Sequence, residues 1–168
     1  MSPLIAGVVL LLQTENPDYK AWAGFKEGSW VKRKTTSVTR QHGKSEMEAT
    51  FKLVKLTADK AVVQISCDLF TKNKRESQPV RLMEVPAKAP PPFKFPGNAA
   101  PKPKVLEGDQ ELKILDRTIP CRWVLESWAE GSTKTWNSPE IPGGLARREM
   151  KGADGGSTEE ILALEAAK

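Results

Sequence analysis

The stretch Lys60-Ala-Val-Val-Gln-Ile-Ser-Cys-Asp-Leu69 alternates between apolar and polar residues. Successive side chains of a β-strand point to opposite faces of a sheet, so alternate residues share a face. One face of this strand carries Ala61, Val63, Ile65, Cys67 and Leu69, and the other carries Lys60, Gln64, Ser66 and Asp68. The pattern predicts a half-buried strand in a sheet with one face on the core and one in water.

Similar segments flank this strand on both sides. Residues Ser29 to Gln41 and Met47 to Thr57 form a predicted hairpin around the turn at Gln41–Lys44, and Val80 to Val85 follows as a fourth strand. The second half repeats the pattern at Leu106–Leu115, Ile119–Trp128, Lys134–Trp136 and Leu145–Lys151. The sequence therefore predicts a mainly β protein built on a single curved antiparallel sheet, a meander shaped like a half-barrel.

The sequence suggests two helices, one before the first predicted strand and one in the C-terminal tail. Glu15 to Phe25 predicts a short helix, because Asn16 suits the N-cap, Pro17 the first turn and Gly24 the end. In the tail, Ser157 and Glu160 fit a capping box before an apolar run, which favours a C-terminal helix. A last strand closing the meander is the alternative for this segment.

A rigid corner follows the strand that ends at Trp136, in the sequence Trp136-Asn-Ser-Pro-Glu-Ile-Pro-Gly-Gly-Leu145. Its two prolines fix φ and remove backbone donors, while Gly143 and Gly144 allow backbone angles closed to other residues. The segment predicts one sharp reversal of the chain that needs no help from side chains.

The 168 residues fit one domain, which we place at residues 15–168. Residues 1–14 are an apolar segment resembling a signal peptide or an anchor, with a buried strand as the alternative. Residues 86–104 are a Pro-rich loop in which Phe93 and Phe95 are expected to pin the loop to the body, with presentation of these aromatics to a partner as the alternative. No apolar run is long enough to span a bilayer. We expect a periplasmic or extracellular protein, with the cytoplasm as the alternative.

The net charge of +5 would assist binding to a polyanion, but the basic residues are spread along the chain. Lys32, Arg33 and Lys34 form the one tight triplet. A solvated strand face explains the other lysines, so nucleic acid is the less favoured partner.

The sequence lacks the residues of common catalytic and metal sites. His42 is the sole histidine and lies at the predicted hairpin tip, where it has no pocket in which to act as a catalytic base. One histidine and two distant cysteines do not supply the usual zinc ligands, and neither phosphate-binding glycine motif occurs. We therefore expect no catalytic residues, no metal and no cofactor, and a protein that is not an enzyme.

Cys67 and Cys121 both fall on predicted inward faces. In an oxidising compartment they could form a disulfide between the two halves of the chain. Two free buried thiols are the alternative.

The chain has five tryptophans, which could pack in the core or line a cavity. Trp123 is expected to face inward and Trp128 to point to the opposite face together with Val124. We predict ligand contacts from Trp22, Trp30, Trp123 and Trp128.

The order of strands, with Trp136, Ser138, Pro139 and Ile141–Leu145 in the late corner, resembles exported bacterial β-sheet proteins of the lipoprotein-carrier class, the LolA and LolB type. The resemblance covers Gly28 to Met150. It implies a curved sheet that wraps a helix and holds acyl chains, although the Pro-rich segment departs from the family pattern.

Three functional hypotheses follow. The first is a non-enzymatic exported envelope protein that binds an apolar ligand or a partner chain on its curved sheet. The second is a structural or assembly subunit of a larger extracytoplasmic complex, with homo-oligomers included. The third is a basic nucleic-acid-binding module that uses Lys32–Lys34.

Overall fold

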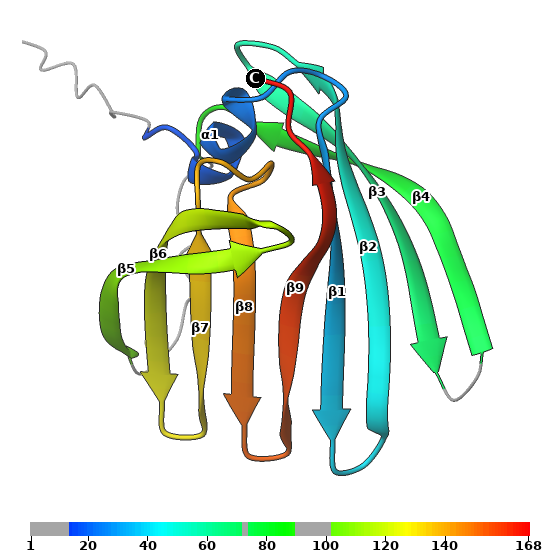
Figure 1. The fold of residues 1–168 in the computed structure, drawn as a ribbon, viewed down its shortest axis with the longest axis vertical. Coiled ribbons are helices and arrows are strands. Elements are labelled where there is room, and N and C mark those ends of the chain that lie inside the picture. The colour runs from blue at the N-terminus through cyan, green and yellow to red at the C-terminus, as the bar shows by residue number, and fades with distance from the viewer. Residues whose placement is uncertain (1–13, 72–73, 90–101) are drawn as a thin grey trace, which may run out of the picture.

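A computed structural model describes residues 14–71, 74–89 and 102–168. Within these residues the chain forms one short helix and nine strands of a single antiparallel sheet (Figure 1). The elements are α1 (Pro17–Ala23), β1 (Trp30–Thr39), β2 (Gly43–Leu56), β3 (Lys60–Thr71), β4 (Lys74–Pro86), β5 (Lys104–Ile114), β6 (Arg117–Trp128), β7 (Gly131–Asn137), β8 (Leu145–Gly152) and β9 (Gly155–Glu165). The predicted fold class, a mainly β protein with one curved antiparallel sheet, is confirmed.

The sheet consists of two meanders, β1 to β4 and β5 to β9, which are joined where β1 pairs with β9. Its order is β4-β3-β2-β1-β9-β8-β7-β6-β5, so the chain crosses from one sheet edge to the other between β4 and β5. β1 and β9 pair along their whole lengths, from Trp30 opposite Glu165 to Thr39 opposite Gly155. The sheet does not close into a barrel, and β4 and β5 remain as its two edges.

The predicted N-terminal helix is present with the expected caps. The side chain of Asn16 accepts a hydrogen bond of 3.0 Å from the backbone N–H of Asp18, and Pro17 occupies the first turn. Gly24 ends the helix. Trp22 is 4% exposed and belongs to the core, so α1 covers one end of a sheet face.

The predicted C-terminal helix is wrong. Residues 155–165 form β9, a central strand that pairs with β1 on one side and β8 on the other. Ser157 lies opposite Ser37 and Met150, and Glu160 lies opposite Lys34 and Arg147, so neither acts as a helix cap. Ladder hydrogen bonds on both sides and burial of one strand face outweigh the intrinsic helix propensity of this segment.

The corner after β7 reverses the chain as predicted and also packs against the helix. Gly143 and Gly144 adopt φ values of 73° and 74°, and Ile141 is fully buried. The backbone N–H of Gly143 donates a hydrogen bond of 3.1 Å to the carbonyl of Ala21 in α1. Side-chain help is present too, because the hydroxyl of Ser138 accepts a hydrogen bond from the backbone N–H of Glu140.

The two cysteines are free thiols in the structure, and the disulfide considered from the sequence is not formed. Cys67 lies on β3 and Cys121 on β6, and five strands separate these two in the sheet order. Cys121 belongs to the buried core, whereas Cys67 is only partly buried. The alternative of two free thiols therefore describes the structure.

Several sequence predictions concern residues that the structure does not describe. The apolar segment at 1–14 lies outside the described residues except for Thr14, and Phe93 and Phe95 of the Pro-rich loop lie outside them as well. His42 is exposed in the turn between β1 and β2, at the predicted hairpin tip.

Candidate functional site

The two faces of the sheet carry different sets of side chains. We call the face that carries Val31, Arg33, Phe51 and Val63 the helix face, because α1 packs at one end of it beside these residues. Directly paired residues on neighbouring antiparallel strands share a face, so the register assigns each residue to one side. The other side is called the opposite face.

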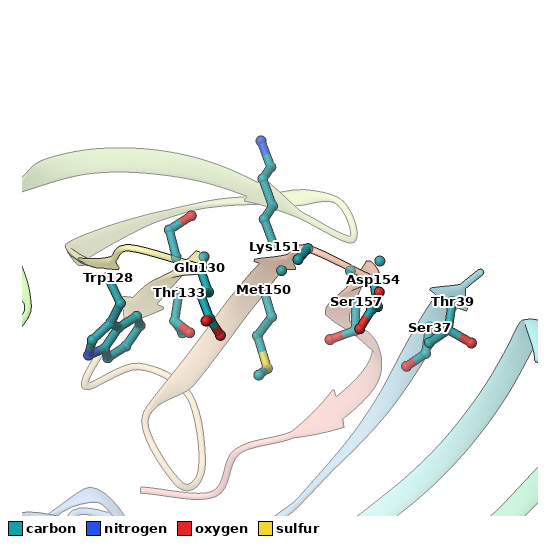
Figure 2. A pocket seen from close by; sticks show the side chains of 15 residues that line it. Ser37, Thr39, Trp128, Glu130, Thr133, Met150, Lys151, Asp154 and Ser157 are labelled. Atoms are coloured by element: carbon teal, nitrogen blue, oxygen red, sulfur yellow. The ribbon is translucent and has the colours of Figure 1, made fainter. Parts of the chain in front are cut away.

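A hollow of about 540 Å³ opens on the helix face at the end away from α1 (Figure 2). Trp128, Met150, Thr133, Ser157 and Ser37 are among the residues that line it. Figure 2 shows Met150 and Lys151 pointing to opposite sides of β8, as alternation along a strand requires. The hollow combines an apolar floor with hydroxyl groups.

A second hollow, of about 450 Å³, lies beside α1 on the same face. Trp22 of the helix and Phe51, Met83 and Val85 of the sheet supply its apolar lining. Arg33 supplies a cation from β1. We call this second space the helix-side hollow.

Arg33 is an unusually placed charge, because its side chain is only 9% exposed. Its Nη2 donates a long hydrogen bond of 3.4 Å to the carbonyl of Pro142, and its Nη1 lies 3.9 Å from Glu159 Oε1. The guanidinium stacks over the ring of Phe51 at 4.9 Å. Burial lowers the pKa of Arg33 to about 10, an effect that Glu159 partly offsets. Arg33 thus remains charged at neutral pH.

A second cation shares the same carboxylate. Arg148 Nη1 lies 3.6 Å from Glu159 Oε2, and Arg148 is opposite Glu159 in the β8–β9 pair. Two guanidinium groups therefore lie against one carboxylate on the helix face. The cluster carries one positive charge more than its own anion balances.

The helix face also carries all three methionines that follow Met1. Met47 lies opposite Leu69 of β3, Met83 opposite Val63 of β3, and Met150 opposite Ser157 of β9. They are 36%, 41% and 47% exposed, respectively. Methionine is flexible and polarizable, and it is over-represented at surfaces that adapt to varied ligands.

The four tryptophans predicted as ligand contacts do not come together. Trp22 and Trp128 both line the helix face, but at its two hollows. Trp30 lies on the opposite face, where its indole N–H donates to Glu165. Trp123 packs against the core with Lys134 placed 4.4 Å from its ring. By register Trp123 also lies on the opposite face, and Trp128 lies on the other side of β6, as strand alternation predicts.

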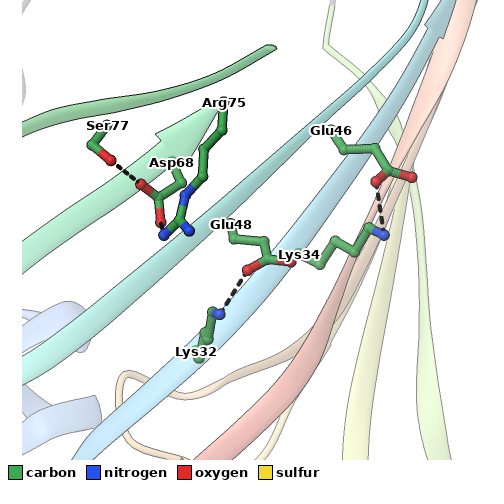
Figure 3. A network of polar contacts seen from close by, with 7 residues as sticks. All are labelled: Lys32, Lys34, Glu46, Glu48, Asp68, Arg75 and Ser77. Atoms are coloured by element: carbon green, nitrogen blue, oxygen red, sulfur yellow. Dashed lines mark hydrogen bonds and ion pairs between the residues drawn. The ribbon is translucent and has the colours of Figure 1, made fainter. Parts of the chain in front are cut away.

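The basic triplet is divided between the two faces. Lys32 and Lys34 point to the opposite face, where their ammonium groups lie 2.6 Å from Glu48 and 2.9 Å from Glu46 (Figure 3). Arg33 points to the helix face. The three residues therefore do not form one exposed basic patch, and the nucleic-acid hypothesis loses the feature on which it was built.

Figure 3 shows a third charged group farther along the opposite face. Asp68 of β3 accepts hydrogen bonds of 2.8 Å from Arg75 Nη2 and 2.6 Å from the hydroxyl of Ser77, both on β4. These hydrogen bonds lower the pKa of Asp68. These three charged groups of the opposite face are thus each paired within the sheet.

Within residues 14–71, 74–89 and 102–168, no cluster of three or more His, Cys, Asp or Glu side chains is arranged to hold a metal ion. In the same part of the chain, no helix has the length and apolarity needed to cross a membrane.

Sequence reasoning named Arg33 only in the basic triplet, and it missed Arg33, Arg148, Glu159 and the methionines as contacts for an apolar ligand. A signal for Arg33 was present, because strand alternation places it on the same side as Val31 and away from Lys32 and Lys34. Its pairing with Glu159 depends on the neighbouring position of β1 and β9, which the sequence did not indicate.

No protein-family model matches the chain, and a search of curated proteins found no match. Among solved structures, the chain is similar to a "putative exported protein with YmcC-like fold" from Bacteroides fragilis. The two are 9% identical with a TM-score of 0.49, and the similarity covers 84% of this chain and 97% of that one. Similarity at this level assigns no function to the chain.

Proposed function

We propose that this protein is a non-enzymatic, exported envelope protein that holds an apolar ligand on the helix face of its sheet. The observation that carries the proposal is that exposed apolar side chains lie around two hollows on this face. On the helix face, exposed Met83 lines one hollow, exposed Met150 and Trp128 line the other, and α1 covers one end only. Exposed apolar groups gathered around a concavity are typical of a binding surface.

The proposal agrees with what the lipoprotein-carrier resemblance implies, a curved sheet with a helix on one face that receives acyl chains. A binding role also fits the chemistry of the described residues better than catalysis does. His42 lies exposed in a turn and is not among the residues that line either hollow. General acid–base catalysis requires a group positioned within hydrogen-bond reach of a bound substrate.

Two adjacent residues of β4 allow a matched test. Met83 lines the helix-side hollow, whereas Leu82 points to the opposite face and is 68% exposed. The purified chain is titrated with the fluorescent apolar probe N-phenyl-1-naphthylamine, and the titration is repeated with Met83→Glu and Leu82→Glu. We expect saturable binding, weakened about tenfold or more by M83E and unchanged by L82E, because a buried carboxylate next to an apolar ligand is costly. Absence of saturable binding in the unmodified chain would overturn the proposal.

Export is tested separately by the intact mass of the protein purified from its native host. Removal of an N-terminal segment resembling a signal peptide is the expected result. An unprocessed N-terminus in a cytoplasmic fraction would contradict the proposed location.

The sheet edges favour one second candidate, an assembly subunit. β4 and β5 are long edge strands with exposed apolar residues, among them Val80 at 59% and Val105 at 51%. Exposed edges can pair with another chain. Sedimentation equilibrium over a wide concentration range tests this: reversible association that Val80→Lys and Val105→Lys weaken is expected, and a monomer at every concentration would exclude self-assembly.

A further inference from the structure

The guanidinium of Arg33 has more hydrogen-bond capacity than its surroundings use. Arginine carries five N–H donors. Among the described residues, Arg33 Nε has no partner, Nη2 makes one long hydrogen bond to Pro142, and Nη1 lies 3.9 Å from Glu159. A buried charged group with unused donors is costly unless another partner satisfies it. An additional acceptor would complete this site.

Arg147, the other residue with an unpaired Nε, is a useful contrast. Its Nε is buried like that of Arg33, but its Nη2 lies 2.7 Å from Glu149 and its side chain as a whole is 43% exposed, so its charge has a close counter-ion and partial solvation. Arg33 has neither a short ion pair nor open exposure. The unsatisfied cation is therefore specific to the helix face.

The charges near Arg33 favour an anion over a neutral acceptor. Arg148 shares Glu159 with Arg33, which leaves one excess positive charge in the cluster. Two carboxylates also line the helix-side hollow. Glu84 is 2.6 Å from Lys60 Nζ and thereby neutralised, and Asp18 is exposed in the first turn of α1. Neither carboxylate forms an ion pair with the guanidinium of Arg33.

The rest of the hollow is suited to hydrocarbon. Trp22, Phe51, Met83 and Val85 surround the space into which Arg33 projects, and its volume of about 450 Å³ is in the range of small-molecule sites. An apolar wall with one buried cation complements a molecule that has an apolar tail and one negative charge.

We infer that the helix-side hollow binds the anionic head group of an apolar-tailed ligand, a carboxylate or phosphate held by the guanidinium of Arg33. This inference rests on the proposed function and names the ligand class that the helix face selects. The planar fork of arginine binds a carboxylate or phosphate through two parallel hydrogen bonds, and Nε supplies one donor that is unused within the chain. The head group lies against Arg33, and the tail follows the apolar residues of the helix face.

The test measures displacement of N-phenyl-1-naphthylamine from the full chain by ligands of equal tail length. Dodecanoate and dodecyl phosphate supply the anionic heads, and 1-dodecanol supplies a neutral one, all below their critical micelle concentrations. Acetate and inorganic phosphate supply the heads without a tail. The variants are Arg33→Met, Arg33→Lys and, as the matched control for loss of one positive charge, Arg147→Met on the opposite face.

We expect dodecanoate or dodecyl phosphate to bind at least about tenfold more tightly than 1-dodecanol, the size expected for a charge-assisted hydrogen bond. R33M should abolish this preference without weakening 1-dodecanol, R33K should retain part of it, and R147M should retain it fully. Equal binding of the anionic and neutral ligands, or a preference unchanged in R33M, would overturn the inference and leave the proposed function standing.

Two other outcomes are also decisive. Displacement by acetate or inorganic phosphate as effective as that by the tailed anions would show a site for free anions, and the inferred ligand class would be wrong. Failure of the probe to bind the unmodified chain would overturn the proposed function itself. If R33M does not fold by circular dichroism, the comparison of dodecanoate with 1-dodecanol in the unmodified chain and in R33K decides between the head groups.

Discussion

The backbone N–H of Gly143 donates to the carbonyl of Ala21, and this 3.1 Å hydrogen bond joins the corner after β7 to the helix at the start of the domain. The same corner supplies the carbonyl of Pro142 to Arg33. A turn whose sequence indicated only a chain reversal thus sets one wall of the helix-side hollow, since Gly143 lies between Trp22 and Arg33.

Gly143→Ala is expected to destabilise the protein by about 1–3 kcal/mol, because its φ of 73° disfavours a side chain and a Cβ there would lie 2.9 Å from the ring of Trp22. Chemical denaturation measures the change. Gly24→Ala is the control, since its φ is −80° and a Cβ there meets nothing within 4 Å. Equal effects of the two substitutions would contradict the role assigned to Gly143.

Asp68 is expected to make part of the stability depend on acid pH. Hydrogen bonds from Arg75 and Ser77 lower its pKa in the folded state, so the unfolded chain binds the proton first. The stabilisation is present above the ordinary carboxyl pKa of 3.8 and is lost as pH falls through the lowered pKa.

Denaturation of the unmodified chain and of Asp68→Asn between about pH 6 and 2 measures this effect. The difference in free energy of unfolding between the two should shrink as pH falls. Ser77→Ala keeps the carboxylate and removes one of its donors, so it should show a smaller pH-dependent loss than D68N. A difference that is constant over this range would argue against the assigned hydrogen bonds.

The two thiols are expected to react slowly in the folded protein at neutral pH. Burial raises the pKa of both Cys67 and Cys121, which reduces the reactive thiolate. Alkylation by iodoacetamide followed by mass spectrometry should modify Cys67 before Cys121, because Cys121 is buried and Cys67 partly exposed. Both should react at once in denaturant without reductant, and a requirement for reductant would reveal a disulfide.

Backbone amides of β9 are expected to exchange slowly with solvent deuterium, because this strand has a partner on each side. Amides of β4, an edge strand with a partner on one side, should include a fast-exchanging set. Hydrogen exchange with mass spectrometry of peptic fragments compares residues 157–164 with residues 74–82. Fast exchange throughout β9 would contradict its central place in the sheet.

The alternation of apolar and polar residues was sufficient to predict most strands. In β3 the pattern from Ala61 to Leu69 gave the strand and the face on which Ala61 and Val63 are buried. Asn16, Pro17 and Gly24 marked the limits of α1. These features depend on residues near each other along the chain, so local patterns contain the information.

The candidate site could be predicted far less well. The two hollows are formed by residues from α1, β1, β2, β4, β6, β7, β8 and β9, and only Trp22 and Trp128 among the predicted contacts line them. A pairing between distant strands decides which side chains meet, as Arg33 and Glu159 do across the β1–β9 pair. The composition of the sequence and the spacing of its residues do not show which distant residues become neighbours.

The sequence alone determined that this chain forms an antiparallel β protein with a capped N-terminal helix, because strand periodicity and cap residues act over a few positions. Only the tertiary structure decided that the tail is β9 rather than a helix, that the basic triplet divides between two faces, and that Arg33 is buried beside an apolar hollow. The physical reason is that strand pairing joins residues more than 100 positions apart, such as Trp30 and Glu165, and this pairing sets both the conformation of the tail and the surroundings of each charge.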